Sequence, residues 1–228
     1  MPELEHPMAH RHTLNRHTPN RDMSTRHAAQ RGFSIIEIAV TLVVLGMLMA
    51  TAVPSMSAWV RNAKLRNQAE SLQTGLQQAR NEAVRRNRPI TFYMVGNGTA
   101  TSLNNSCTVS DTGTSWVVSV RDPGSACAAA PATSSTNATN PLIVAKQLGG
   151  DGAKGVSVAG LAADGSTAAS SVTFDALGRR SGTLTRLVVS HAVAQTDDRP
   201  LRLDITPAGM VRSCDPLITS TSDPRRCL

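Results

Sequence analysis

Residues 31–54 read RGFSIIEIAVTLVVLGMLMATAVP, and this segment is the strongest indication of how the chain folds. From Phe33 to Val53 it holds 21 residues with a single charge, that of Glu37. As a helix rising about 1.5 Å per residue, it would cover roughly 30 Å, the thickness of a bilayer core. A cleaved secretory signal has a shorter apolar region that ends in small residues. The stretch therefore predicts a signal anchor, and the basic residues before it place the N-terminus in the cytoplasm.

Glu37 lies four residues inside this apolar segment. A carboxylate in that environment is costly, so it needs a partner or a function. The alternative is an acidic side chain that reaches the membrane interface and has no further role. The residues alone leave both interpretations open.

The combination of these residues resembles the prepilin signature of type IV pilins and type II secretion pseudopilins. It consists of a basic leader ending in Gly32, then Phe33, then Glu37 as the fifth residue of the mature chain, then the apolar run. The resemblance implies that prepilin peptidase cleaves between Gly32 and Phe33 and methylates the Phe33 amine. It also implies that Glu37 pairs with the N-terminal amine of a neighbouring subunit in the filament. Glycine suits the cleavage point because it lets a protease approach the backbone closely.

The leader, residues 1–32, holds five of the six histidines and five arginines against three acidic residues. The irregular histidine spacing does not indicate a metal site. Met23 begins a ten-residue basic leader of the usual proportions. We therefore expect Met23, rather than Met1, to be the true start.

After the apolar segment, residues 33–53, the sequence predicts an amphipathic continuation of the same helix over residues 54–88. Pro54 should kink the helix because it lacks an N–H and clashes with the preceding turn. Apolar residues then recur at spacings of three and four, which predicts one buried stripe. Its members are Leu65, Ala69, Leu72, Leu76, Ala79 and Ala83. The helix should stop before Pro89.

Residues 89–228 have a period nearer two and are predicted to form a β-rich domain. The candidate strands are Ile90–Val95, Trp116–Arg121, Leu142–Ala145, Gly155–Ala159, Ser171–Phe174, Leu184–Ser190, Leu201–Thr206 and Met210–Arg212. Residues 122–141 are rich in Ala, Ser, Thr, Asn and Pro, which predicts a long loop. One long helix followed by many short strands predicts an α+β fold in which the helix packs on an antiparallel sheet.

Several segments in this order resemble the GspH/FimT family of minor pilins. They are the helix end at Leu76–Ile90, the strand at Ser115–Val118, the strand and turn at Ser171–Arg179, and the last hairpin at Leu203–Cys214. The resemblance covers nearly all of the chain from Arg31. A cysteine after the last hairpin, followed by a final cysteine, is more similar to pilus members than to secretion pseudopilins.

The four cysteines are Cys107, Cys127, Cys214 and Cys227. A domain outside the cytoplasm favours disulfides, and four cysteines allow three pairings. We favour the nearest-neighbour pairs, Cys107–Cys127 and Cys214–Cys227. A zinc site is not indicated, because there is no Cys-x-x-Cys spacing and the body has one histidine, His191.

Catalysis has little support in the sequence. Neither a Gly-x-Ser-x-Gly elbow nor a His-Glu-x-x-His motif occurs. His191 is predicted to be a surface or strand-end residue. We therefore expect a protein that is not an enzyme and that uses no cofactor or metal.

The chain carries a net charge of +7, and only 3% of its residues are aromatic. The scarcity of aromatic residues argues against a protein that stacks nucleic-acid bases. Contact with DNA through phosphates needs no aromatic residues, so it is kept as an alternative. The candidate contacts are Arg179, Arg180, Arg212, Arg225 and Arg226. Some pilus-side relatives are thought to bind DNA through a Gly-Arg-x-Arg motif, but Met210 replaces the first arginine here, so a solvated basic face or contacts to a neighbouring pilin are favoured.

The sequence leads to three hypotheses about function. The leading one is a non-catalytic minor pilin for assembly or priming of the type IV pilus. The alternatives are a minor pseudopilin of type II secretion and a filament-displayed DNA-binding subunit. The expected partners are other major and minor pilins or pseudopilins, prepilin peptidase and the inner-membrane assembly platform. The expected location is the bacterial inner membrane, single-pass with a periplasmic body, and then the filament.

Overall fold

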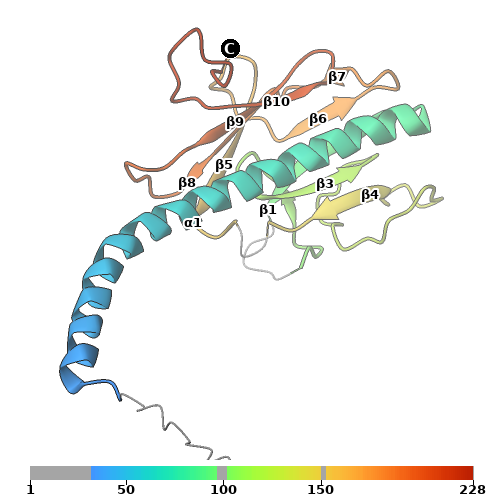
Figure 1. The fold of residues 1–228 in the computed structure, drawn as a ribbon. Coiled ribbons are helices and arrows are strands. Elements are labelled where there is room, and N and C mark those ends of the chain that lie inside the picture. The colour runs from blue at the N-terminus through green and yellow to red at the C-terminus, as the bar shows by residue number, and fades with distance from the viewer. Residues whose placement is uncertain (1–31, 97–101, 150–152, 228) are drawn as a thin grey trace, which may run out of the picture. The chain divides into compact units, whose positions relative to one another are not determined.

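The computed structural model describes residues 32–96, 102–149 and 153–227, without the side chains of residues 51–55. Met23 and the predicted leader, apart from Gly32, lie outside the described residues. The chain divides into two compact units, Met1–Gly46 and Met47–Leu228. The first contains the beginning of helix α1 (Ile35–Arg86). The second contains the rest of α1 and every described strand (Figure 1).

Helix α1 is 52 residues long, and local signals mark both of its ends. At the start, the Ser34 carbonyl accepts a hydrogen bond from the N–H of Ile38. At the end, Asn87 has a φ of 48°, and the N–H of Arg88 donates to the Ala83 carbonyl at 3.2 Å. A left-handed residue followed by a bond reaching back five positions is a Schellman-type cap. The helix therefore ends two residues before the predicted limit at Arg88.

The first sheet has six strands in the order β4-β3-β1-β6-β7, with β2 also paired to β1. All of its pairings are antiparallel, and Tyr93 of β1 lies between Val117 of β3 and Ser171 of β6. The strands are β1 (Ile90–Gly96), β2 (Thr108–Val109), β3 (Ser115–Ser119), β4 (Ile143–Gln147), β6 (Ser171–Phe174) and β7 (Arg180–Ser181).

The second sheet has four strands in the order β10-β9-β8-β5, again all antiparallel. Leu203 at its centre pairs with Leu187 on one side and Ser213 on the other. Alternate residues of β5 and β8 are buried, so one face of this sheet is turned to the core. The strands are β5 (Val156–Leu161), β8 (Arg186–His191), β9 (Leu201–Ile205) and β10 (Val211–Cys214).

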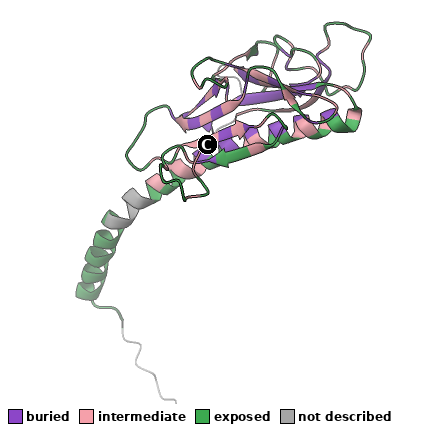
Figure 2. Ribbon diagram, turned by 90° about the horizontal axis from the view of Figure 1, so that it is seen from above, coloured by how far each residue is buried: buried purple, intermediate pink, exposed green. Residues whose placement is uncertain are grey.

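A single apolar core joins α1 to both sheets. The predicted stripe from Leu65 to Ala83 is confirmed, because all six of its residues are buried. In Figure 2 this side of the helix is purple, and its opposite side is green. Gly75 lets α1 approach the first sheet closely, since a Cβ there would lie 2.7 Å from the Trp116 ring. The indole Nε1 of Trp116 donates to Ser71 Oγ at 3.1 Å.

The α+β class is confirmed, and all eight predicted strands appear with ends shifted by up to two residues. Two differences remain. The strands form two sheets rather than one, and β2 and β7 were not predicted. Each of these strands has only two residues, so it carries no alternation of its own and exists through pairing with its neighbour.

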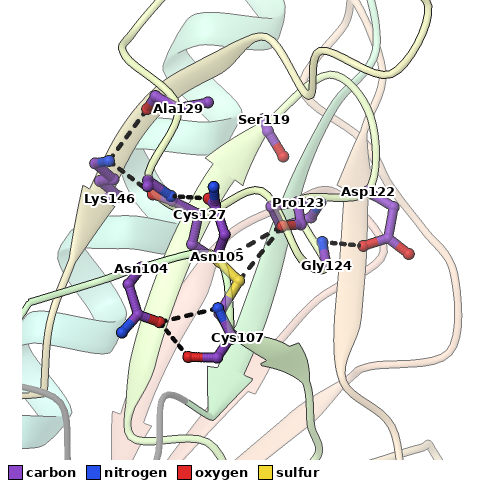
Figure 3. Close-up of a disulfide and its surroundings, with 12 residues drawn as sticks. Asn104, Asn105, Cys107, Ser119, Asp122, Pro123, Gly124, Cys127, Ala129 and Lys146 are labelled. Atoms are coloured by element: carbon purple, nitrogen blue, oxygen red, sulfur yellow. Dashed lines mark hydrogen bonds between the residues drawn. A yellow bond between two sulfur atoms is a disulfide. The ribbon is translucent and has the colours of Figure 1, made fainter.

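A disulfide between Cys107 and Cys127 fixes the long loop over the outer face of the first sheet (Figure 3). Both cysteines are buried with Val95, Val117 and Ile143 in a second small core. The ammonium group of Lys146 on β4 donates to the carbonyls of Cys127, at 2.7 Å, and Ala129, at 3.1 Å. The loop from 122 to 141 is therefore attached at its start, although it contains no strand among its residues.

Candidate functional site

The predicted cleavage and assembly residues lie at the start of α1. Gly32 and Phe33 precede the helix, and Glu37 lies in its first turn. Phe33 and Glu37 are exposed, and no ion pair of Glu37 occurs within the described residues. A carboxylate in the first turn interacts favourably with the positive end of the helix dipole. The peptide bond and the carboxylate that the prepilin signature implies are thus both accessible from outside the chain.

The beginning of α1 has no buried side. All residues from Ile35 to Ala50 are exposed, and most of them are large and apolar. An apolar helix without a covered face requires a partner outside the chain, either lipid or another protein. The accessible Glu37 lies in this otherwise apolar surface.

No helix in the described part of the chain combines the length and the apolar character needed to cross a membrane.

Pro54 lies within α1, which continues on both sides of it. Its side chain is among those not described. The kink at Pro54 stays a prediction.

The second disulfide joins Cys214, the last residue of β10, to Cys227. The tail between them also returns to β10 through its backbone, since Asp215 N–H donates to the Arg225 carbonyl at 2.8 Å. With Cys107–Cys127, this is the nearest-neighbour pairing favoured by the sequence. Asp204, Cys214 and Cys227 also bring three potential metal-ligand atoms within 4.8 Å of one another. Both sulfur atoms belong to the disulfide, so neither is a thiolate that could bind a metal.

The five candidate arginines fall into different environments. Arg179 pairs with Asp175 at 2.9 Å, and Arg225 pairs with Asp223 at 2.8 Å. The hydrogen bond from the Arg179 backbone N–H is the main cause that lowers the pKa of Asp175. The Arg225 side chain does the same for the pKa of Asp223. These two arginines are therefore partly neutralised by local carboxylates.

Arg180 and Arg212 lie together in a surface cavity of about 280 Å³, which is lined by residues of β7, β8, β9 and β10. The polar and charged residues that line it are Arg180, Thr185, Arg186, Asp204, Thr206 and Arg212. The Nε atom of Arg180 is buried and has no hydrogen-bond partner. An Arg212 nitrogen donates to the carbonyl of Pro224 at 2.9 Å, which places Arg212 beside the segment that carries Arg225 and Arg226.

Sequence reasoning missed two members of this cavity, Arg186 and Asp204. They face each other across β8 and β9, with a closest N–O distance of 3.4 Å. Asp204 also pairs with Arg202 at 2.8 Å. The Asp204 carboxylate therefore forms ion pairs with two arginines, and the lining of the cavity has an excess of positive charge. Arg186 lies within the predicted strand Leu184–Ser190, but nothing in the sequence of that strand singles out its arginine.

His191 ends β8, as predicted, but it is buried rather than on the surface. Its ring nitrogens lie 3.2 Å from the carbonyl oxygens of Gly155 and Arg61. Asp198, on the loop after β8, accepts hydrogen bonds from the Arg61 guanidinium at 2.9 and 3.0 Å. These contacts attach the β8–β9 loop to α1, and they assign His191 a structural role.

Burial by itself raises the pKa of Asp198. The hydrogen bonds from Arg61 and from the Gln195 N–H, together with nearby positive charge, outweigh it and lower the pKa below its ordinary value. Asp198 is therefore held as a carboxylate. Its role was not predicted, because 137 residues separate it from Arg61 in the sequence.

Comparison with known families supports the sequence resemblance. Residues 68–209 match the family described as type II transport protein GspH. Residues 27–53 match the prokaryotic N-terminal methylation motif. No curated protein matches the chain.

Among solved structures, two crystal forms of the type IV minor pilin FimU of Pseudomonas aeruginosa are similar to this chain. Both are 20% identical and cover 68% of this chain, with TM-scores of 0.38 and 0.40. The alignments cover 99% and 90% of the FimU chains. Because the GspH family model spans more than half of the sequence and the methylation motif precedes it, this chain belongs to the GspH family of pilin-like filament subunits.

Proposed function

We propose that this chain is a minor pilin of the type IV pilus. In this proposal, prepilin peptidase removes residues 1–32 and methylates Phe33. The apolar segment 33–53 then holds the subunit in the inner membrane, with its body in the periplasm, until the assembly platform moves it into the filament. It contributes no catalysis.

The observation that carries the proposal is the exposed apolar surface at the start of α1, which contains the single charge of Glu37. Burying this surface between subunits is favourable, at about 25 cal/mol per Å² of apolar area. A buried carboxylate is tolerated only with a partner. The new amine of Phe33 on a neighbouring subunit would supply that partner, so subunits in the wrong register are disfavoured.

The closed C-terminal loop, Cys214–Cys227, supports the pilus over the secretion system. These two cysteines, at the last hairpin and near the end of the chain, are the feature in which the sequence is more similar to pilus members than to secretion pseudopilins. A deletion strain distinguishes the two functions. We expect loss of surface pili with normal secretion of exported proteins. Normal pili with a secretion defect would support the pseudopilin instead.

The charge-matching role of Glu37 is tested with Glu37→Ala. We expect normal cleavage of the leader, seen as a shift in mass, but strong loss of the subunit from sheared filaments. Glu70→Ala is the matched control, because Glu70 is an exposed glutamate on the packed half of α1. Normal incorporation of Glu37→Ala would contradict the proposal.

A second candidate function is DNA binding on the filament, and the arginine-lined cavity favours it. Arg180, Arg186 and Arg212 outnumber the single carboxylate of Asp204 there. Such a site would bind phosphates without sequence preference, and its affinity would fall steeply with salt.

The test is DNA binding by the full chain at low and moderate salt. We expect the double variant Arg180→Gln/Arg212→Gln to weaken binding and to reduce the salt dependence. The control is Arg179→Gln/Arg225→Gln, which removes two arginines that already have carboxylate partners. Equal effects of both double variants would mean that the cavity has no special role. Absence of binding at low salt would exclude the DNA function.

A further inference from the structure

The feature that the assembly proposal leaves unexplained is a short apolar patch on α1 just after the predicted membrane segment. Met56, Trp59 and Val60 are all exposed, and Trp59 is 70% exposed. We propose that Trp59 is a membrane-interface anchor, which sets the depth of the subunit at an anionic phospholipid surface before assembly. This inference rests on the proposed function, since it requires a membrane-anchored subunit.

The patch lies on the side of α1 that faces away from the body. Leu65 marks the buried side. With 3.6 residues per turn, Trp59 is rotated about 120° from Leu65, and Met56 about 180°. The polypeptide itself therefore does not cover these side chains. Farther along the same outer side, the helix becomes polar, with exposed Arg66, Asn67, Glu70, Thr74 and Gln77.

The position of the patch matches the interface between lipid and water. Trp59 follows Val53, the last residue of the apolar run, by six positions, or about 9 Å of helix. This distance places it beyond the hydrocarbon core and among the headgroups. Tryptophan is enriched in that layer because its ring is apolar and its N–H can be hydrated.

The charges next to the patch favour a phospholipid surface over a neighbouring protein helix. Lys64 and Arg66 follow it within two turns, and neither forms an ion pair with a carboxylate of the described residues. Arg61, by contrast, is neutralised by Asp198. Two cations that have no carboxylate partner in the described part of the chain, close to an exposed tryptophan, are complementary to anionic headgroups. A helix like the apolar start of α1 offers them no counter-charge except its single Glu37.

The chain contains a built-in reporter for this proposal. It has two tryptophans, and the second, Trp116, is 4% exposed and packed against Phe92 and α1. We would insert the full chain into vesicles of phosphatidylethanolamine and phosphatidylglycerol, and measure its fluorescence. Matched vesicles carry lipids brominated close to the headgroup or near the end of the acyl chain. We expect shallow bromines to quench the emission several-fold more than deep ones.

Two variants show which tryptophan gives the quenching signal. Trp59→Phe leaves only Trp116, so the difference between shallow and deep bromines should disappear. Asn67→Trp in the Trp59→Phe background moves the reporter two turns along the outer side of α1, and we expect no quenching by either lipid. Strong quenching at position 67 would mean that the whole helix lies on the membrane, which overturns an anchor at Trp59.

The remaining outcomes are also decisive. If the chain floats with the vesicles but Trp59 is not quenched and emits as in water, the patch is not a lipid anchor, and a neighbouring subunit becomes its occupant. If the chain does not float with the vesicles, the membrane-anchored function itself is wrong. The two failures are therefore distinguishable.

Discussion

The two ends of helix α1 have the same secondary structure but opposite relations to the rest of the chain. From Ile35 to Ala50 every residue is exposed, although most are apolar. From Leu65 to Ala83 the apolar residues form one stripe, and each of them is buried under the sheets. Helix formation is thus not what separates the two regions. The difference is where the apolar surface finds its partner, which is outside the chain for the first region and within it for the second.

This difference has a physical origin in the pattern of residues. The first region is apolar all round, so folding of one chain cannot cover it. The second has a single apolar side, which one pair of sheets can cover completely. Substitutions at matched positions in the two regions should therefore have different effects on the stability of the folded body.

The largest difference is expected for truncation of a leucine in each region. Leu76→Ala removes a fully buried side chain, and we expect a loss of about 2–5 kcal/mol in the free energy of unfolding. Leu45→Ala should leave that free energy nearly unchanged. Urea denaturation of the detergent-solubilised chain, followed by Trp116 fluorescence in a Trp59→Phe background, measures both. Equal losses would mean that the two regions are not distinct.

A second comparison uses the two glycines of α1. A Cβ at Gly75 would meet the rings of Trp116 and Phe92 at 2.7–2.8 Å, whereas Gly46 has no neighbouring atom within 4 Å. We expect Gly75→Leu to destabilise the body by about 1–3 kcal/mol through overpacking. Gly46→Leu should not destabilise the body. The same denaturation measurement tests both, and a stable Gly75→Leu variant would contradict the close approach of α1 to β3.

The contact between Arg61 and Asp198 lies at the boundary between the two regions. Asp198→Asn should cost about 1 kcal/mol or less at neutral pH, because the ion pair is only partly buried. The pKa of Asp198 is below its ordinary value in the folded state. Its stabilising effect is therefore present above the unfolded pKa of about 3.9 and is lost as the pH falls through the folded pKa.

Denaturation of wild type and Asp198→Asn over a range of pH tests whether the stabilisation by the Asp198 carboxylate is lost on acidification. The two stability curves should converge below about pH 4. A difference that grows on acidification would show that the carboxylate is not the stabilising form.

The smallest effect is expected at the C-terminal end of the packed region, where Glu82 pairs with Arg85 and Arg86 at 2.6 Å. The hydrogen bond from Arg85 is the main cause that lowers the pKa of Glu82. Pairs at these helical spacings contribute about 0.2–0.5 kcal/mol each. Glu82→Gln should therefore lower the free energy of unfolding by less than Asp198→Asn does. Added salt should reduce the difference between wild type and Glu82→Gln. A larger loss would indicate a contact beyond these two arginines.

Most of the fold could be predicted, because its signals are local. The spacing of Leu65, Ala69 and Leu72 predicts the buried stripe, and alternation predicts the longer strands. The two-residue strands β2 and β7 could not be predicted, since pairing with a neighbour is their only cause. Asp198 and Asp204 were likewise missed. Their partners, Arg61 and Arg186, are brought to them by the packing of the helix and the second sheet.

The candidate site also has residues that could be predicted from the sequence and residues that could not. Gly32, Phe33 and Glu37 lie in one continuous motif, residues 27–53, so they can be identified without knowing which surfaces of the folded chain meet. This motif, the long helix and the α+β class all follow from the order of the residues alone. The folded chain was needed to show three further properties: the cavity shared by Arg180, Arg186 and Arg212, the burial of His191, and the position of Trp59 on the side of α1 that faces away from the body. These properties depend on which surfaces meet, and contacts between residues far apart in the chain leave no periodic trace in the sequence.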